Sequence, residues 1–110
     1  MEKFEGGTAV VTGGASGLGL AFAHRFAEAG MNVVLADIEA EPLAMAEASV
    51  AAKGVKVMPV RTDVANPEEI EALATKTYER FGKVNILCNN AGIGGSPGNT
   101  WELSQKDWEW

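Results

Sequence analysis

The sequence predicts an α/β fold, with a parallel sheet of strand order 3-2-1-4 that carries helices on both faces. Short β-branched segments alternate with amphipathic segments of helical period along the 110 residues. That alternation is typical of parallel strands joined by right-handed helical crossovers. The segment 8–12 does not alternate between apolar and polar residues, which indicates a strand buried on both faces. The length predicts a single domain, residues 1–110.

The first half of the chain is expected to contain two strands and two helices. After the strand at 8–12, apolar residues recur on one helical face over 17–29, and Gly30 follows as a stop. The second strand is expected at 32–37. The second helix is expected over 42–53, because Pro42 is tolerated in a first turn and Gly54 follows the last residue.

The second half adds two strands and a third helix. Pro59 lies inside the strand expected at 55–61, which favours an edge position. Asn66 and Pro67 supply a strong helix start, and the apolar repeat then runs to Phe81. The fourth strand, 84–89, is expected at an uncovered apolar edge, as if the chain were truncated after strand four.

Composition excludes several classes of function. The net charge is −6 and no run of basic residues occurs, so nucleic-acid binding is not expected. No apolar run approaches the length of a membrane helix, and the N-terminus lacks an apolar signal core. The lone Cys88 excludes an internal disulfide and a structural zinc centre, and it fits a reducing cytoplasm.

The turn after the first strand is unusually rich in glycine. It reads Thr-Gly-Gly-Ala-Ser-Gly-Leu-Gly from Thr12 to Gly19, between a buried strand and an amphipathic helix. A helix N-terminus presents unpaired N–H groups to an anion, and glycines let a pyrophosphate approach the backbone. Asp37 ends the second strand, where an acid can accept hydrogen bonds from an adenosine ribose. This context predicts a Rossmann-type dinucleotide site.

Other interpretations of the turn fit less well. A P-loop needs a lysine where Leu20 stands, and a nucleophile elbow around Ser16 needs a glycine where Leu18 stands. A plain glycine-rich turn is disfavoured, because each glycine costs backbone entropy. A methyltransferase would also use a glycine-rich loop and an acid after strand two, so the turn alone leaves it open.

Three motifs together resemble the short-chain dehydrogenase/reductase family. The turn 12–19 resembles its cofactor motif, Asp63-Val64 its adenine-contacting pair, and Asn89-Asn90-Ala91-Gly92 its second signature. They occur in the family's order, each at the end of a strand, and the resemblance spans essentially the whole chain. The methyltransferase interpretation predicts neither the second nor the third motif.

The resemblance implies a role for each matching residue. Main-chain groups of the turn would hold the pyrophosphate, Asp37 the ribose hydroxyls, and Asp63 with Val64 the adenine edge. Ile38 would lie against the adenine, and Asn89 would tie neighbouring strands together. The complete set of expected cofactor-binding residues is Gly13, Ala15, Ser16, Gly17, Leu18, Gly19, Asp37, Ile38, Asp63, Val64, Asn90, Ala91 and Gly92.

Charge predicts NAD as the preferred cofactor over NADP. The 2′-phosphate of NADP would approach Asp37, and like charges repel. No Lys or Arg in the turn offsets that charge, and Glu39 and Glu41 add to it.

The resemblance implies an oxidoreductase that acts on an alcohol or carbonyl substrate, with a tyrosine four residues before a lysine as its catalytic pair. The only tyrosine, Tyr78, is followed at that position by Gly82 and lies on the apolar face of its helix. No catalytic residue is therefore assigned, and the 110-residue chain alone is expected to be inactive. A longer protein is expected to be a homo-oligomer. The alternative is a stand-alone nucleotide-binding or interaction module, with Trp101, Trp108 and Trp110 at its exposed edge.

Overall fold

The computed structural model describes residues 5–15, 17–90 and 100–102. Its elements follow in the order β1 (Thr8–Thr12), α1 (Gly17–Glu28), β2 (Asn32–Asp37), α2 (Ala40–Ala51), β3 (Val57–Arg61), α3 (Pro67–Phe81), β4 (Ile86–Asn89) and β5 (Thr100–Glu102). The strands form one sheet in the order β3-β2-β1-β4-β5. β3, β2, β1 and β4 are mutually parallel, which confirms the predicted order 3-2-1-4.

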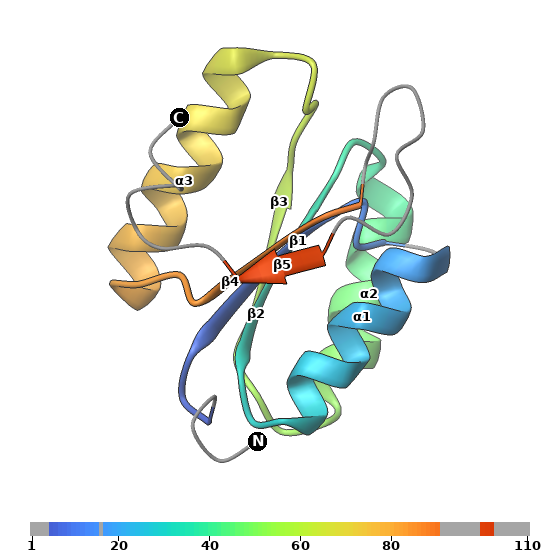
Figure 1. Ribbon diagram of the computed structural model, residues 1–110. Helices are drawn as coiled ribbons and strands as arrows, with labels where there is room; N and C mark the ends of the chain where they lie inside the picture. Colours follow the sequence, from blue (N-terminus) through green and yellow to red (C-terminus); the bar gives the residue numbers. More distant parts are fainter. Residues whose placement is uncertain (1–4, 16, 91–99, 103–110) are drawn as a thin grey trace.

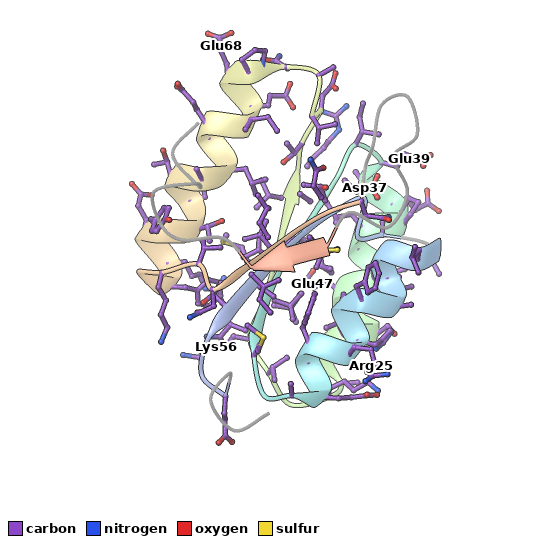
Figure 2. The ribbon with its side chains drawn as sticks, viewed as in Figure 1. Arg25, Asp37, Glu39, Glu47, Lys56 and Glu68 are labelled. Carbon is purple, nitrogen blue, oxygen red and sulfur yellow. The ribbon has the colours of Figure 1, made fainter. Side chains whose placement is uncertain are left out.

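Both faces of the sheet are covered by helices. α1 and α2 lie on one face and α3 on the other (Figure 1). Side chains fill the space between the sheet and both helix layers (Figure 2). Because successive side chains of a strand point to opposite faces, Val11 packs in the α1–α2 core while Val10 packs in the α3 core. Every residue of β1 is therefore buried, as its unbroken pattern predicts.

The third helix has the predicted signals at both ends. The Asn66 side chain accepts hydrogen bonds from the N–H groups of Glu68 and Glu69, and Pro67 follows it in the first turn. Gly82 ends the helix in the left-handed conformation, with φ 76°. Tyr78 packs against the α3 core, which confirms that its role is packing.

Some element boundaries differ from the prediction. α2 begins two residues before Pro42, at Ala40, because a proline in the first turn removes only an N–H that has no helical partner. β3 begins at Val57 instead of residue 55, and β4 at Ile86 instead of residue 84. β3 lies at the edge of the sheet, which confirms the position that Pro59 predicts.

The expectation of an uncovered edge at β4 is wrong. β5 pairs antiparallel with β4 and brings Thr100 opposite Cys88 and Glu102 opposite Ile86. The pairing satisfies backbone groups of β4 that an uncovered edge would leave free. Sequence reasoning missed β5 because a strand of three residues is too short to show a period. Trp108 and Trp110, which the alternative interpretation places at an exposed edge, lie outside the described residues.

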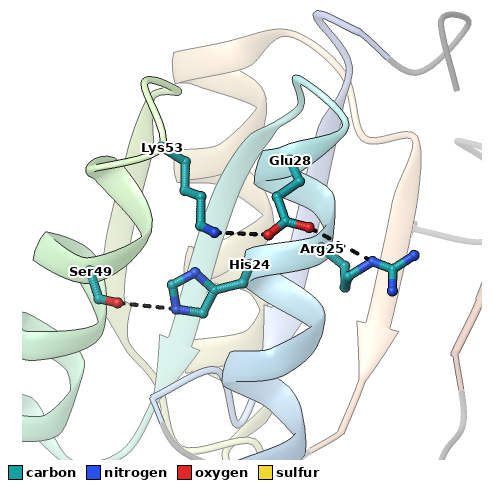
Figure 3. A network of polar contacts seen from close by, with 5 residues as sticks. All are labelled: His24, Arg25, Glu28, Ser49 and Lys53. Atoms are coloured by element: carbon teal, nitrogen blue, oxygen red, sulfur yellow. Dashed lines mark hydrogen bonds and ion pairs between the residues drawn. The ribbon is translucent and has the colours of Figure 1, made fainter.

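A polar network joins α1 to α2 on the outer side of the molecule (Figure 3). Lys53 Nζ lies 2.8 Å from Glu28 Oε2, and Arg25 Nε lies 4.0 Å from Glu28 Oε1. His24 Nε2 lies 3.1 Å from Ser49 Oγ, and the histidine is half-buried. The network therefore adds polar contacts between helices that already share the core beneath them.

The pKa of Glu28 should depend on Lys53. The hydrogen bond and the charge of Lys53 lower the pKa of this carboxyl from its ordinary value. Because the folded pKa is depressed, the stabilisation is present above the unfolded pKa and is lost as the pH falls through the folded pKa. Lys53→Gln should return the Glu28 pKa toward its ordinary value in an NMR titration. Lys56→Gln, an exposed control, should leave that pKa unchanged. An unchanged Glu28 pKa in Lys53→Gln would show that the ion pair does not form.

Leu73 should be a major contributor to stability. Its side chain is fully buried between α3 and the sheet. We expect Leu73→Ala to lower the free energy of unfolding by about 2–5 kcal/mol, because it removes buried surface and leaves a cavity. Glu71→Ala, on an exposed position of the same helix, should change it by less than about 0.5 kcal/mol. Urea unfolding of both variants measures the difference, and equal losses would contradict this core assignment.

Candidate functional site

A pocket lies where three parallel strands end. It has a volume of about 130 Å³, and its lining consists of Gly13, Ala36, Asp37, Ile38, Thr62, Asp63 and Val64. Gly13 follows β1, Ala36 and Asp37 end β2, and the last three residues follow β3. The carboxyl ends of strands are where open α/β sheets bind ligands. The pocket brings together five residues that the sequence predicts as cofactor-binding, from three separate segments of the chain.

The glycine-rich turn is fixed to the end of β2. The Gly14 N–H donates to the Ala36 carbonyl over 3.2 Å, and the Ala15 N–H donates to Asp37 Oδ2 over 3.1 Å. Gly13 has a φ of 65°, in the left-handed region that favours glycine. The carboxylate of Asp37 thus holds the turn, and the residue also lines the pocket.

The other carboxylate oxygen of Asp37 shapes the start of the next loop. Asp37 Oδ1 accepts from the Ile38 N–H over 2.8 Å and from the Glu39 N–H over 3.3 Å. Asp37 and Glu39 lie at the same end of the molecule, and Arg25 and Lys56 lie at the opposite end (Figure 2). None of the described residues that line the pocket is basic. The described lining therefore offers carboxylates as acceptors to the hydroxyl groups of a ligand. It offers no cation to the 2′-phosphate of NADP.

Gly19 allows the closest backbone approach in the site. A Cβ atom on this residue would overlap the carbonyl oxygen of Gly13 and would lie 2.9 Å from Asn90 Nδ2. Only glycine lets α1 begin so close to the turn. Gly17 has a φ of 57° and open space around it, so its requirement is conformational. Leu18, the residue between these two glycines, is half exposed.

Thr12 connects the ends of β1 and β4. Its Oγ1 lies 3.0 Å from Asn89 Oδ1 and accepts from the Asn90 N–H over 3.0 Å. Asn90 is thereby placed beside the glycine-rich turn. It lies between the ends of β1 and β4, where the strand order of the sheet reverses direction. Asn89 ties neighbouring strands, as the resemblance implies. The predicted site residues Ser16, Ala91 and Gly92 lie outside the described residues.

Sequence reasoning missed two residues of the pocket. Ala36 and Thr62 line it beside the predicted Asp37 and Asp63. The Thr62 hydroxyl donates to the Val60 carbonyl over 3.1 Å, and its N–H donates to the Asp37 carbonyl over 2.8 Å. Each residue directly precedes an acid at a strand end, and that adjacency was the only signal available.

Within 5–15, 17–90 and 100–102, no group of His, Cys, Asp and Glu is arranged to hold a metal ion. Within the same ranges, no helix combines the length and apolar character needed to cross a membrane. Cys88 is buried in β4, where it packs as a small apolar residue.

Comparison with known proteins gives one consistent result. A family model described as short chain dehydrogenase matches residues 7–110. A 1-deoxy-11-beta-hydroxypentalenate dehydrogenase of Streptomyces exfoliatus is 44% identical over 96 residues, which cover 86% of this chain and 35% of that protein. The chain thus spans about a third of the length of the curated relatives it matches.

Two solved structures with bound cofactor are similar to this chain. A short chain dehydrogenase/reductase from Burkholderia phymatum in complex with NAD has a TM-score of 0.75 and 46% identity, over 79% of this chain and 31% of that one. L-sorbose reductase from Gluconobacter frateurii, complexed with NADPH and L-sorbose, has a TM-score of 0.80 and 38% identity, over 98% of this chain and 41% of that one. Proteins with this fold therefore bind either cofactor.

Gly19→Ala should damage the site directly. The added methyl group would force the turn away from α1, at a cost of about 1–3 kcal/mol in the free energy of unfolding. We also expect weaker binding of ADP-ribose, measured by calorimetry. Gly54→Ala is the control because, unlike Gly19, Gly54 has a left-handed φ, of 92°, and no atom near its Cβ position. It should lower stability by about 1 kcal/mol without changing ADP-ribose binding. Unchanged binding in Gly19→Ala would contradict the placement of the site at this turn.

Proposed function

The chain belongs to the short-chain dehydrogenase family, and from that premise we propose that the protein carrying it is an NAD-dependent oxidoreductase. It would transfer hydride between NAD and an alcohol or carbonyl substrate, with this chain as the dinucleotide-binding part. The nicotinamide supplies the hydride chemistry, and the chain supplies binding and orientation. The observation that carries the proposal is the pocket shared by Gly13, Asp37 and Asp63 at the ends of β1, β2 and β3.

Each part of the dinucleotide has a proposed partner. The turn from Gly13 to Gly19, with Ala15, Ser16, Gly17 and Leu18 between, would hold the pyrophosphate at the start of α1. Asp37 would accept hydrogen bonds from the adenosine ribose. The adenine would be surrounded by Ile38, Asp63 and Val64.

The path toward the nicotinamide would be bordered by Asn90, Ala91 and Gly92.

The preference for NAD rests on the charge around Asp37. Asp37 lines the pocket, and exposed Glu39 lies close along the chain. A 2′-phosphate there would meet negative charge in a partly desolvated position. The nearest cation by strand register is Arg61, which lies opposite Asp37 on β3. Arg61 is exposed and is not among the described residues that line the pocket.

We propose that catalysis by the whole protein needs residues outside this chain. The family's tyrosine and lysine have no counterpart among residues 1–110, because Gly82 stands four positions after Tyr78. The chain alone, taken as one domain, is therefore expected to bind NAD without turnover. A cytoplasmic location fits the single buried cysteine. We also propose a homo-oligomer for the whole protein.

The cofactor preference can be tested by changing one charge. We expect the protein to bind NAD about tenfold or more tightly than NADP. Asp37→Asn should reduce that ratio by about tenfold, because it removes the charge nearest the 2′ position. The ratio of the two dissociation constants, measured by calorimetry, is insensitive to a general loss of stability.

Glu79→Gln is the matched control. It makes the same change in net charge near the opposite end of α3 from the pocket, so it should leave the ratio unchanged. A wild-type preference for NADP would refute the NAD assignment, and Arg61→Gln would then identify the cation that binds the 2′-phosphate. Failure to bind either dinucleotide would refute the proposed function itself.

A further inference from the structure

Glu69 makes an unusual contact at the start of α3. Its Oε1 accepts from the Asp63 N–H over 2.8 Å, and its Oε2 accepts from Asn66 Nδ2 over 3.2 Å. In an ordinary capping box, the acid at this position reaches back to the N–H of the N-cap residue. Here the N–H of the N-cap residue, Asn66, donates to the Asp63 carbonyl instead, over 2.9 Å. The Glu69 carboxylate therefore bonds to the backbone of the loop that precedes the N-cap residue, and it holds that loop against the start of α3.

The loop that Glu69 holds forms one wall of the pocket. Asp63 and Val64 line the pocket, whereas Glu69 does not. Asp63 Oδ1 is already engaged with the Ala65 N–H, over 2.9 Å. The loop is thus closed by three hydrogen bonds that involve Asp63, and Glu69 supplies the only one of the three that anchors it to α3. An anchored loop loses less conformational freedom when a ligand binds.

We propose that Glu69 is a positioning residue for the adenine end of the dinucleotide, acting through Asp63 and Val64. The inference rests on the proposed function, because it assumes that the pocket receives an adenine nucleotide. In this arrangement a half-buried acid on α3, outside the pocket, sets the shape of the wall that contacts the adenine. Without Glu69, the Asp63 N–H would lose its acceptor and the loop would be free to leave its bound position.

The test compares ligands with and without adenine. In the intact protein, Glu69→Ala should raise the dissociation constant of ADP-ribose about tenfold, the loss expected from one charge-assisted hydrogen bond. The dissociation constant of nicotinamide mononucleotide, which has no adenine, should stay unchanged. Glu69→Gln should recover part of the loss, because its single amide oxygen can still accept from the Asp63 N–H. Calorimetry or NMR titration gives all of these constants.

Glu68→Ala is the matched control. Glu68 lies in the same first turn and carries the same charge, but its side chain is exposed and points away from the molecule (Figure 2). It shares the interaction with the helix dipole, so any effect of charge at the helix start appears in both variants. Glu68→Ala should leave ADP-ribose binding unchanged. A loss of stability in Glu69→Ala would affect both ligands, so the ratio of the two constants isolates the positioning effect.

The outcomes separate this inference from the proposed function. If the wild-type protein binds ADP-ribose and Glu69→Ala binds it equally well, only the role of Glu69 is refuted. Equal losses for ADP-ribose and nicotinamide mononucleotide would likewise refute positioning in favour of a general structural effect. If the wild-type protein binds neither ligand, the proposed function and the inference both fail.

Discussion

The sheet is buried on both faces, and this burial fixes where the strands end and where the site forms. β1 lies between β2 and β4 and has no exposed residue, because α1 and α2 cover one face and α3 covers the other. A strand held in this way ends at a fixed place. The turn that begins at Gly13 is therefore set beside the ends of β2 and β3, and the site inherits its geometry from the core.

Acidic side chains hold two walls of the pocket in place through hydrogen bonds to the backbone. Asp37 bonds to the N–H of Ala15 and fixes the turn to β2, and Glu69 bonds to the N–H of Asp63 and fixes the next loop to α3. In both cases a carboxylate accepts from a backbone N–H of a neighbouring loop, an interaction stronger than a neutral hydrogen bond. Two walls of the pocket are thus fixed by charge-assisted bonds. A ligand that enters would meet hydrogen-bonding groups already in place.

The comparisons place these features in the short-chain dehydrogenase family, and the charge around the pocket then bears on cofactor choice. Similar structures contain NAD in one case and NADPH in another, so the fold alone does not select between them. Under the proposed function, the choice between the two cofactors depends on the charged residues near the end of β2. In this chain that position holds Asp37, with Glu39 following it and Arg61 opposite it on β3.

Sequence patterns alone predict the order and type of most elements and the segments that meet at the site. Helical and strand periods are local, and the caps at Asn66 and Gly82 depend on residues close along the chain. Three features are visible only in the folded chain: β5 pairs with β4, Thr62 lines the pocket, and Glu69 accepts a hydrogen bond from the Asp63 N–H. A strand pairing or a side-chain hydrogen bond depends on where separate segments of the chain meet in space. The local spacing of apolar residues along the sequence does not predict where they meet.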